Sequence, residues 1–236
     1  MSTTRLTKHA TAGAFVLAAT LGLGTASVMP AQSAVVAVAP APTTTTVTVL
    51  DATLAFGETT KVTVSVDTVT PGSKPTGKVE LKVGDKVLVA DVAASGKVDF
   101  DLPVVNASVT PYAVTATFIP TDATAFSGST SAPVAVTVVK DETTSTVTAR
   151  HKMGMDKIVA KNVVTSLHGQ VPTGTAKFVL KRNGVKLAAT IVDLNAVGKA
   201  RAKFLDVPDK GVYKVISKYL GSDNFLKSRG TFKIVA

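Results

Sequence analysis

Hydrophobic and polar residues alternate with a period of two along much of this chain, which is the pattern of half-buried β-strands. In the stretch 61–66, for example, Val62, Val64 and Val66 fall on one face and polar residues on the other. The alternating segments in the first half of the chain are 47–49, 61–66, 77–83, 86–92, 97–102, 112–118 and 134–139. Seven short strands separated by turn residues predict an all-β sandwich of the immunoglobulin type. Beyond the N-terminal segment, no stretch has a convincing helical period.

The second half of the chain has the same plan of inward and outward positions. Gly84-Asp85 and Asn183-Gly184 interrupt the alternation in the two halves, and both pairs predict hairpin turns. The positions that we expect to face the cores are Val98, Phe100, Leu102, Tyr112, Val114, Ala116 and Phe118 in the first half, and Phe178, Leu180, Ala200, Ala202, Phe204, Tyr213, Val215, Ser217 and Tyr219 in the second.

Short motifs recur at a spacing of about one hundred residues, which indicates two copies of one domain. The Thr-rich start at Thr43 returns at Thr143, and Pro75-Thr76-Gly77 returns at Pro172. The late residues Phe118, Asp122 and Phe126 return as Tyr219, Asp223 and Phe225. We name residues 43–140 copy one and residues 141–236 copy two. The sequence therefore predicts two tandem immunoglobulin-like β-sandwich domains.

One position fits this repeat poorly. The stretches from Gly57 and from Gly154 to the two Pro-Thr-Gly turns have equal lengths, so the copies align there without a gap. This alignment puts Lys161 of copy two opposite the inward Val64 of copy one. We expect a β-bulge at Lys161, or a lysine whose aliphatic stem lies on the edge of the core.

The N-terminal segment has the features of an export signal. Arg5 and Lys8 precede an uncharged, mostly apolar stretch at 11–29, and small residues follow near Ser33 and Ala34. We therefore predict a secretory signal peptide at 1–34 and an Ala/Pro-rich linker at 35–42, with no membrane span in the mature chain. The alternative is an uncleaved N-terminal anchor. Either outcome predicts a protein that is secreted or associated with the cell envelope.

These motifs together resemble a known family. The Thr-rich start 43–48, Phe56-Gly57, the segment 75–79 and Ala116-Thr117-Phe118 with its following Asp122 are similar to the bacterial Ig-like repeat domains of actinobacterial secreted and surface proteins. The resemblance covers both copies. It implies an immunoglobulin-like sandwich in the envelope or outside the cell, and it implies no catalytic residues.

The residue types of the chain offer little catalytic chemistry. There is no cysteine, so disulfides, thiol catalysis and cysteine zinc sites are excluded. His151 and His168 have no nearby nucleophile turn and no metal-ligand spacing, and we interpret them as solvent-exposed loop residues. Asp99 and Asp101 lie two residues apart and are expected on a solvated strand face. The sequence therefore predicts no enzyme, no cofactor and no metal site.

Other recurring polar residues have structural interpretations. Asp122 and Asp223 are expected to shape a loop through hydrogen bonds from backbone N–H groups to their side chains. Tyr112, Tyr213 and Tyr219 fall at inward positions, so core packing is favoured over a platform for sugars.

Charge separates the two copies. Copy one has a formal net charge of −2 and copy two of +10. The third, sixth and seventh strands of an immunoglobulin-like fold usually share a sheet, and strand parity points several lysines of copy two outward there. These lysines are Lys177, Lys181, Lys214, Lys218 and Lys233. They predict a basic face that either attracts polyanions or only keeps the protein soluble.

The sequence thus favours a non-catalytic extracellular protein of tandem Ig-like repeats that acts in adhesion, as a spacer or as an envelope-associated module. The alternative is a binder of anionic cell-wall or capsular polymers through the basic face of copy two. Expected partners are anionic glycopolymers or another surface protein. Because arginine is scarce and exposed aromatics are missing, sequence-specific nucleic acid is not expected.

Overall fold

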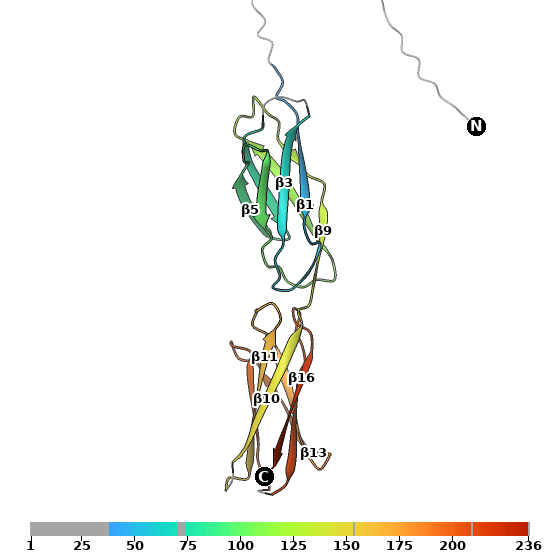
Figure 1. The fold of residues 1–236 in the computed structure, drawn as a ribbon, viewed down its shortest axis with the longest axis vertical. Coiled ribbons are helices and arrows are strands. Elements are labelled where there is room, and N and C mark those ends of the chain that lie inside the picture. The colour runs from blue at the N-terminus through green and yellow to red at the C-terminus, as the bar shows by residue number, and fades with distance from the viewer. Residues whose placement is uncertain (1–37, 70–73, 153, 209, 236) are drawn as a thin grey trace, which may run out of the picture. The chain divides into compact units, whose positions relative to one another are not determined.

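The computed structural model describes residues 38–69, 74–152, 154–208 and 210–235, which form β-strands and contain no helix (Figure 1). The predicted signal peptide at 1–34 and the first three residues of the linker at 35–42 lie outside the described residues. Within the described part, accordingly, no helix is long and apolar enough to cross a membrane.

Copy one consists of two sheets that enclose one core. Its strands are β1 (Thr43–Val49), β2 (Thr53–Ala55), β3 (Lys61–Thr68), β4 (Gly77–Val83), β5 (Lys86–Asp91), β6 (Lys97–Asp101), β7 (Tyr112–Pro120), β8 (Ser129–Thr130) and β9 (Val134–Val139). One sheet has the order β1-β3-β6, and the other has the order β2-β9-β7-β4-β5, with β8 paired to β7. The short β2 runs parallel to β9, while the other pairs are antiparallel.

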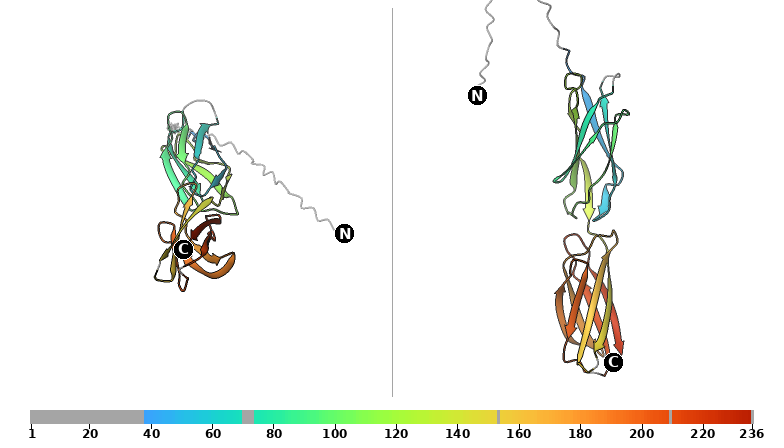
Figure 2. Two further views of the ribbon diagram at one scale, coloured as in Figure 1. Left: turned by 60° about the horizontal axis from the view of Figure 1, so that its bottom comes forward. Right: turned by 90° about the vertical axis from the view of Figure 1, so that its left-hand side faces the viewer.

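Copy two repeats this arrangement with fewer strands. They are β10 (Thr143–Lys152), β11 (Lys157–Ser166), β12 (Thr175–Arg182), β13 (Val185–Asp193), β14 (Lys199–Phe204), β15 (Val212–Tyr219) and β16 (Ser228–Val235). Its sheets have the orders β10-β11-β14 and β13-β12-β15-β16. Both copies therefore have the predicted immunoglobulin-like β-sandwich fold (Figure 2). The exact domain boundaries, at residues 43, 140 and 141, stay a prediction.

Alternation along the strands builds both cores, as the sequence predicts. Strand β4 alternates buried and exposed residues along its whole length, and β6 and β14 do the same. Phe100 and Phe204 are only 7% and 4% exposed. The core of copy one draws on both of its sheets, with Val64 from β3 and Leu81 from β4 among its members. Burial of these apolar faces is the main stabilising contribution to each sandwich.

The expectation for Lys161 is wrong. Lys161 is exposed and pairs with Thr148, just as Thr63 pairs with Thr48 in copy one. Strand β11 has no bulge, and its alternation continues unbroken. The residue that takes the inward place of Val64 is therefore the next one, Asn162. The connection from this position to the Pro-Thr-Gly turn is one residue shorter in copy two (Asn162 to Pro172) than in copy one (Val64 to Pro75), so an ungapped alignment shifts the register by one residue.

Tyrosines close the corner before the sixth long strand of each sandwich. The Tyr112 hydroxyl donates to Asn106 O at 2.9 Å, and the Tyr213 hydroxyl donates to Pro208 O at 2.8 Å. A tyrosine that bonds to the backbone a few residues upstream is a known feature of immunoglobulin-like folds. The expected packing role is confirmed for Tyr213 and Tyr219, which are 0% and 1% exposed, whereas Tyr112 is half-buried.

Every predicted strand segment of copy one overlaps an observed strand. The segments 77–83 and 134–139 match the bounds of β4 and β9, and the other predicted ends differ from the observed ends by up to four residues. Strands β2 and β8 were not predicted, because three and two residues are too few to show an alternating pattern. At the Asn183-Gly184 hairpin both residues have positive φ, of 50° and 85°, as a type I′ turn requires.

Candidate functional site

The five lysines that the sequence marks as a basic face lie on adjacent strands of one sheet of copy two. Lys177 of β12 pairs with Lys218 of β15, and Lys181 of β12 pairs with Lys214 of β15. Lys214 also pairs with Lys233 of β16. Lys181 is half-buried and the other four are exposed. These lysines therefore form two rows of cations across the outer surface of the sheet.

Two further cations extend these rows. Arg229 pairs with Lys218, and Lys186 pairs with Lys181. Between the rows, Val179 pairs with Ile216, which is only 8% exposed although its position has the outward parity of its strand. Long lysine side chains commonly cover such apolar surface with their methylene stems. We call this surface, which consists of Lys177, Lys181, Lys186, Lys214, Lys218, Arg229 and Lys233, the predicted basic face.

Like charges on the predicted basic face lie directly opposite one another across neighbouring strands. Such pairs destabilise a sheet. None of the ion pairs in the described ranges involves these seven residues. Anions that approach this surface are therefore attracted by several uncompensated charges at once.

The paired carboxylates of copy one have local partners. Thr63 donates its hydroxyl to Asp99 Oδ1 at 2.6 Å, and Lys61 Nζ lies 2.7 Å from Asp101 Oδ1. The hydrogen bond to Asp101 raises the pKa of Lys61 above its usual value. Both carboxylates lie on the exposed face of β6, as expected from the sequence.

The expected loop role is confirmed for Asp122 and is wrong for Asp223. Asp122 Oδ1 accepts the Thr124 hydroxyl at 2.6 Å and the backbone N–H groups of Thr124 at 2.8 Å and Ala125 at 3.2 Å. The bond from the Thr124 hydroxyl is the largest cause that lowers the pKa of Asp122. Asp223 is exposed, and its side chain makes no hydrogen bond to the part of the chain that the structure describes.

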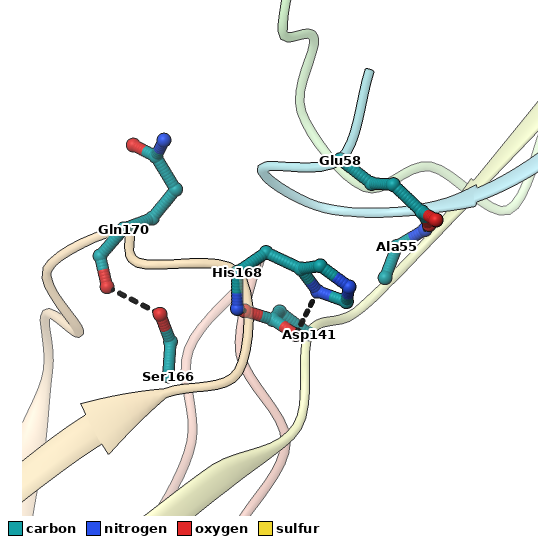
Figure 3. Close-up of polar contacts among 6 residues, drawn as sticks. All are labelled: Ala55, Glu58, Asp141, Ser166, His168 and Gln170. Carbon is teal, nitrogen blue, oxygen red and sulfur yellow. Dashed lines mark hydrogen bonds and ion pairs between the residues drawn. The ribbon is translucent and has the colours of Figure 1, made fainter. Parts of the chain in front are cut away.

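The expectation of solvent-exposed histidines is wrong. The His168 side chain is 29% exposed, and its Nδ1 lies 2.8 Å from Oδ1 of Asp141, whose side chain is 0% exposed (Figure 3). The His168 backbone N–H also donates to Asp141 Oδ2 at 3.1 Å. His151 is half-buried, and its ring lies parallel to the ring of Tyr213 with 6.4 Å between centroids.

This buried carboxylate is specific to copy two. Asp141 forms a parallel bridge with Phe225, and the corresponding bridge of copy one joins Ala41 to Phe126. The same backbone position is therefore alanine just before copy one and aspartate at the start of copy two. Both carboxylate oxygens of Asp141 contact His168, one at the ring Nδ1 and the other at the backbone N–H. Asp141 therefore fixes the loop that carries His168.

Among the residues that the structure describes, none places a nucleophile beside the aspartate–histidine pair in the geometry of a hydrolase. The nearby Ser166 hydroxyl points away from His168 and donates to Gln170 O at 2.6 Å (Figure 3). A serine hydrolase requires the serine hydroxyl to bond to the histidine ring. Across the described ranges there is also no group of three or more His, Cys, Asp or Glu side chains with metal-binding geometry.

Residues around Asp141 also connect copy one with copy two through apolar contacts. The rings of Phe56 and Phe225 meet edge to face, with 5.3 Å between their centroids and 89° between their planes. Gly57 has a φ of 97°, and a Cβ atom on it would lie 2.7 Å from Gln170 Cγ and 3.2 Å from His168 Cβ. The loop of copy one that carries these residues is therefore packed closely against copy two.

Polar contacts join the same two regions. Asn224 Nδ2 donates to Asn106 Oδ1 at 2.9 Å, and the Ala107 backbone N–H donates to Asn224 Oδ1 at 2.9 Å. Lys140 Nζ donates to Ser222 O at 2.7 Å. We name Phe56, Gly57, Asn106, Ala107, Asp141, His168, Gln170, Asn224 and Phe225 the joint.

The comparisons with known proteins give likeness of fold only. No family model and no curated protein matches the chain. A solved structure of a tetra-tandem repeat from the extending region of a large adhesion protein is 14% identical, with a TM-score of 0.45 over 83% of this chain and 49% of that one. The Yersinia pseudotuberculosis adhesin InvE is 12% identical, with a TM-score of 0.39 over 82% of this chain and 58% of that one. The chain thus spans less than two thirds of either structure, and likeness of this degree assigns no function.

Sequence reasoning missed the joint almost entirely. Phe56-Gly57 stands out in the sequence as a motif, but nothing in its spacing identifies Phe225 as its partner. Asn224 directly follows the recurring Asp223, but the repeat pattern does not mark Asn224 as the residue that contacts Asn106 and Ala107. The change from Ala41 to Asp141 is visible once the copies are aligned, and it is the one signal that could have located the joint.

Proposed function

We propose that this protein is a non-catalytic extracellular module in which two immunoglobulin-like sandwiches serve as a spacer or adhesion unit. The observation that carries the proposal is the joint. A spacer holds its ends at a defined separation only if the segment between its domains is fixed. Here the connecting segment contains the buried Asp141, which is held by two contacts to His168.

A direct test measures how well the two copies are fixed to one another. The chain has no cysteine, so single cysteines at exposed Glu80 and Thr165 can carry spin labels without a background signal. A spacer predicts a narrow distribution of label separations that broadens in a Phe56→Ala, Asn224→Ala double variant. A broad distribution in the unaltered joint would contradict the proposal.

The extracellular part of the proposal is tested by fractionation. The apolar, uncharged segment at 11–29 and the small residues after it support export and cleavage near Ala34. N-terminal sequencing of the protein from medium, wall and membrane fractions is expected to begin near residue 35. Recovery of the uncleaved chain only in the cytosol would refute the extracellular location.

A second candidate function is the binding of anionic cell-wall or capsular polymers through the predicted basic face. The opposition of Lys177 to Lys218 and of Lys181 to Lys214 favours it, because such rows cost stability without an anion. The full chain is expected to be retained on heparin or on purified wall polymer at about 0.15 M salt, where the Debye length is about 8 Å.

Replacement of the four lysines Lys177, Lys181, Lys214 and Lys218 by glutamate should abolish this retention. If retention persists in that variant, another part of the surface is responsible. If the unaltered chain is not retained at that salt concentration, the predicted basic face serves only solubility.

A further inference from the structure

The outer face of the other sheet of copy two is also cationic, in a way that the sequence did not single out. Strands β10, β11 and β14 contain seven lysine and arginine residues and no aspartate or glutamate. The seven are Arg150, Lys152, Lys157, Lys161, Lys199, Arg201 and Lys203. Within the described ranges none of them takes part in an ion pair.

The pairing of these strands brings like charges together at the middle of the sheet. Lys161 of β11 lies directly opposite Arg201 of β14. At the same place in copy one, Thr63 lies opposite Asp99 and donates a hydrogen bond to it. A favourable neutral–anionic pair of copy one is thus replaced by an unfavourable pair of cations, which lowers the stability of copy two.

The next outward position along the strand shows the same reversal of charge. Asp101 of copy one pairs with Lys61 and forms an ion pair with it, whereas Lys203 of copy two pairs with Val159. Both aspartates of β6 have therefore become cations in β14 on an unchanged backbone register. Residues that lower the stability of the fold are expected mainly at functional sites.

The surface in front of these strands is hollowed. A cleft of 610 Å³ is lined by five of the seven cations and by polar side chains. The cations of the cleft are Arg150, Lys152, Lys161, Lys199 and Arg201, and the polar residues include Thr148 and Asn195. The volume falls in the range of about 300–1,000 Å³ that is usual for ligand sites.

The Asn195 side chain is already oriented at the cleft. Its Oδ1 accepts the backbone N–H groups of Val197 at 3.1 Å and Lys199 at 2.9 Å. The amide Nδ2 is left as a donor, and the Thr148 hydroxyl supplies a second neutral hydrogen-bonding group at the cleft. Neutral donors among cations suit a ligand that carries both hydroxyl and anionic groups.

We propose that the cleft over β10, β11 and β14, hereafter the cationic cleft, binds a linear anionic glycan that carries phosphate, sulfate or carboxylate groups. Outward residues two apart on a strand are about 6.6 Å apart, and adjacent strands are about 4.8 Å apart. The cations therefore form a grid that contacts several anionic groups of one extended polymer. Arg150 and Arg201 add guanidinium groups, which bond to such anions in bidentate geometry.

A glycan fits the lining of the cleft better than a single-stranded nucleic acid does. Proteins that bind single strands stack the bases on aromatic side chains, and the residues that line this cleft include no aromatic. The choice of a glycan also rests on the extracellular location proposed above.

The test grafts the surface of copy one onto copy two. The triple variant Lys161→Thr, Arg201→Asp, Lys203→Asp introduces residues that copy one already holds at the same register, so folding is expected to be preserved or improved. Binding of the full chain to heparin, a polyuronate, a glycerol-phosphate polymer and single-stranded DNA is measured at about 0.15 M salt. We expect the triple variant to bind the preferred anionic polymer about tenfold more weakly or worse.

A matched control separates the cleft from net charge. The variant Lys82→Asp, Lys86→Asp, Lys227→Thr changes the net charge by the same amount at exposed positions outside both cationic surfaces. It is expected to change the dissociation constant less than about twofold, since exposed charges beyond a Debye length of about 8 Å are screened. An equal loss in both variants would overturn the proposal.

A third variant, Lys177→Thr, Lys214→Asp, Lys218→Asp, compares the two surfaces of copy two. A loss of binding confined to this variant would overturn the cationic cleft and support the predicted basic face instead. Absence of binding to all four polymers would overturn both. Tighter binding of DNA than of every other polymer, lost in the first triple variant, would refute the glycan as the ligand of the cleft.

Discussion

At one place in the fold, copy one has Asp99 beside Thr63, and copy two has Arg201 beside Lys161. The strands and their register are the same in both copies. Outward positions of a sheet are therefore free to reverse their charge without moving the backbone, because the inward residues determine the register. The copies have kept a common scaffold while their surfaces have diverged from −2 to +10 in formal charge.

The cores of the two copies differ as well. Val64 and Ala116 of copy one correspond to Asn162 and Ser217 of copy two, and all four are 0% exposed. Within the described residues, Ser217 Oγ and Asn162 Oδ1 have no hydrogen-bond partner, while Asn162 Nδ2 donates to Ser145 Oγ at 3.3 Å. Buried polar groups without partners cost stability. Copy two is thus destabilised both in its core and on its surface relative to copy one.

The largest effect is expected where the copies are alike. Phe100→Ala and Phe204→Ala each remove a buried ring, which costs about 3–5 kcal/mol of unfolding free energy in the copy that carries it. Hydrogen exchange of β6 and β14 in each variant reports the two copies separately. If Phe204→Ala left the exchange of β14 unchanged, the inward register of that strand would be wrong.

Gly57 of the joint and Gly154, which lies outside the joint, are a matched pair of glycines with different surroundings. Gly57→Ala forces a Cβ to within 2.7 Å of Gln170, whereas a Cβ on Gly154 has no atom within 4 Å. Both residues have positive φ, so each variant carries a backbone strain of about 1–2 kcal/mol. We expect Gly57→Ala to lower the thermal midpoint clearly more than Gly154→Ala does.

Gly57→Ala is also expected to broaden the spin-label separation between Glu80 and Thr165, while Gly154→Ala leaves it narrow. Equal effects of the two variants on the midpoint and on the separation would show that Gly57 does not act through the joint.

Removal of the buried polar groups of copy two should raise its stability. Ser217→Ala installs the residue of copy one and removes a hydroxyl that has no partner, for a gain of about 1 kcal/mol. The reciprocal Ala116→Ser is expected to destabilise copy one by a similar amount. Urea denaturation of both variants checks this, and a lower midpoint for Ser217→Ala would reveal that its hydroxyl stabilises the core.

The smallest effect concerns pH. Hydrogen bonds from Thr124 and Ala125 hold the pKa of Asp122 below the ordinary value of 3.8. A lowered pKa in the folded state stabilises copy one above the ordinary pKa, and this contribution disappears as the pH falls through the folded value. Asp122→Ala is therefore expected to lower the melting temperature at pH 7 but not near pH 2.

The matched control is Asp223→Ala in copy two. Asp223 has no comparable hydrogen bonds within the described residues, so this variant should have little effect at either pH. A difference between Asp122→Ala and the unaltered chain that persisted at low pH would show that the loop depends on shape and not on charge.

Alternation predicted most of the strands, because burial on one face imposes a period of two that the sequence carries directly. It also predicted that Lys177 and Lys214 face outward, since parity along a strand is a local property. It did not predict that Lys161 is outward and Asn162 inward. That register depends on the lengths of the connections on either side of the strand, and the residues of a loop indicate its length only weakly.

The amino-acid sequence by itself determined the repeat, most of the strands, most of the inward residues and the unequal charge of the copies. Only the tertiary structure decided which charges become neighbours, because cross-strand pairing joins residues such as Lys161 and Arg201 that lie far apart in the chain. It also decided that Phe56 meets Phe225, and that Asp141 is buried beside His168. Such contacts depend on the closure of long loops and the packing of whole sheets, and no local pattern of residues encodes them.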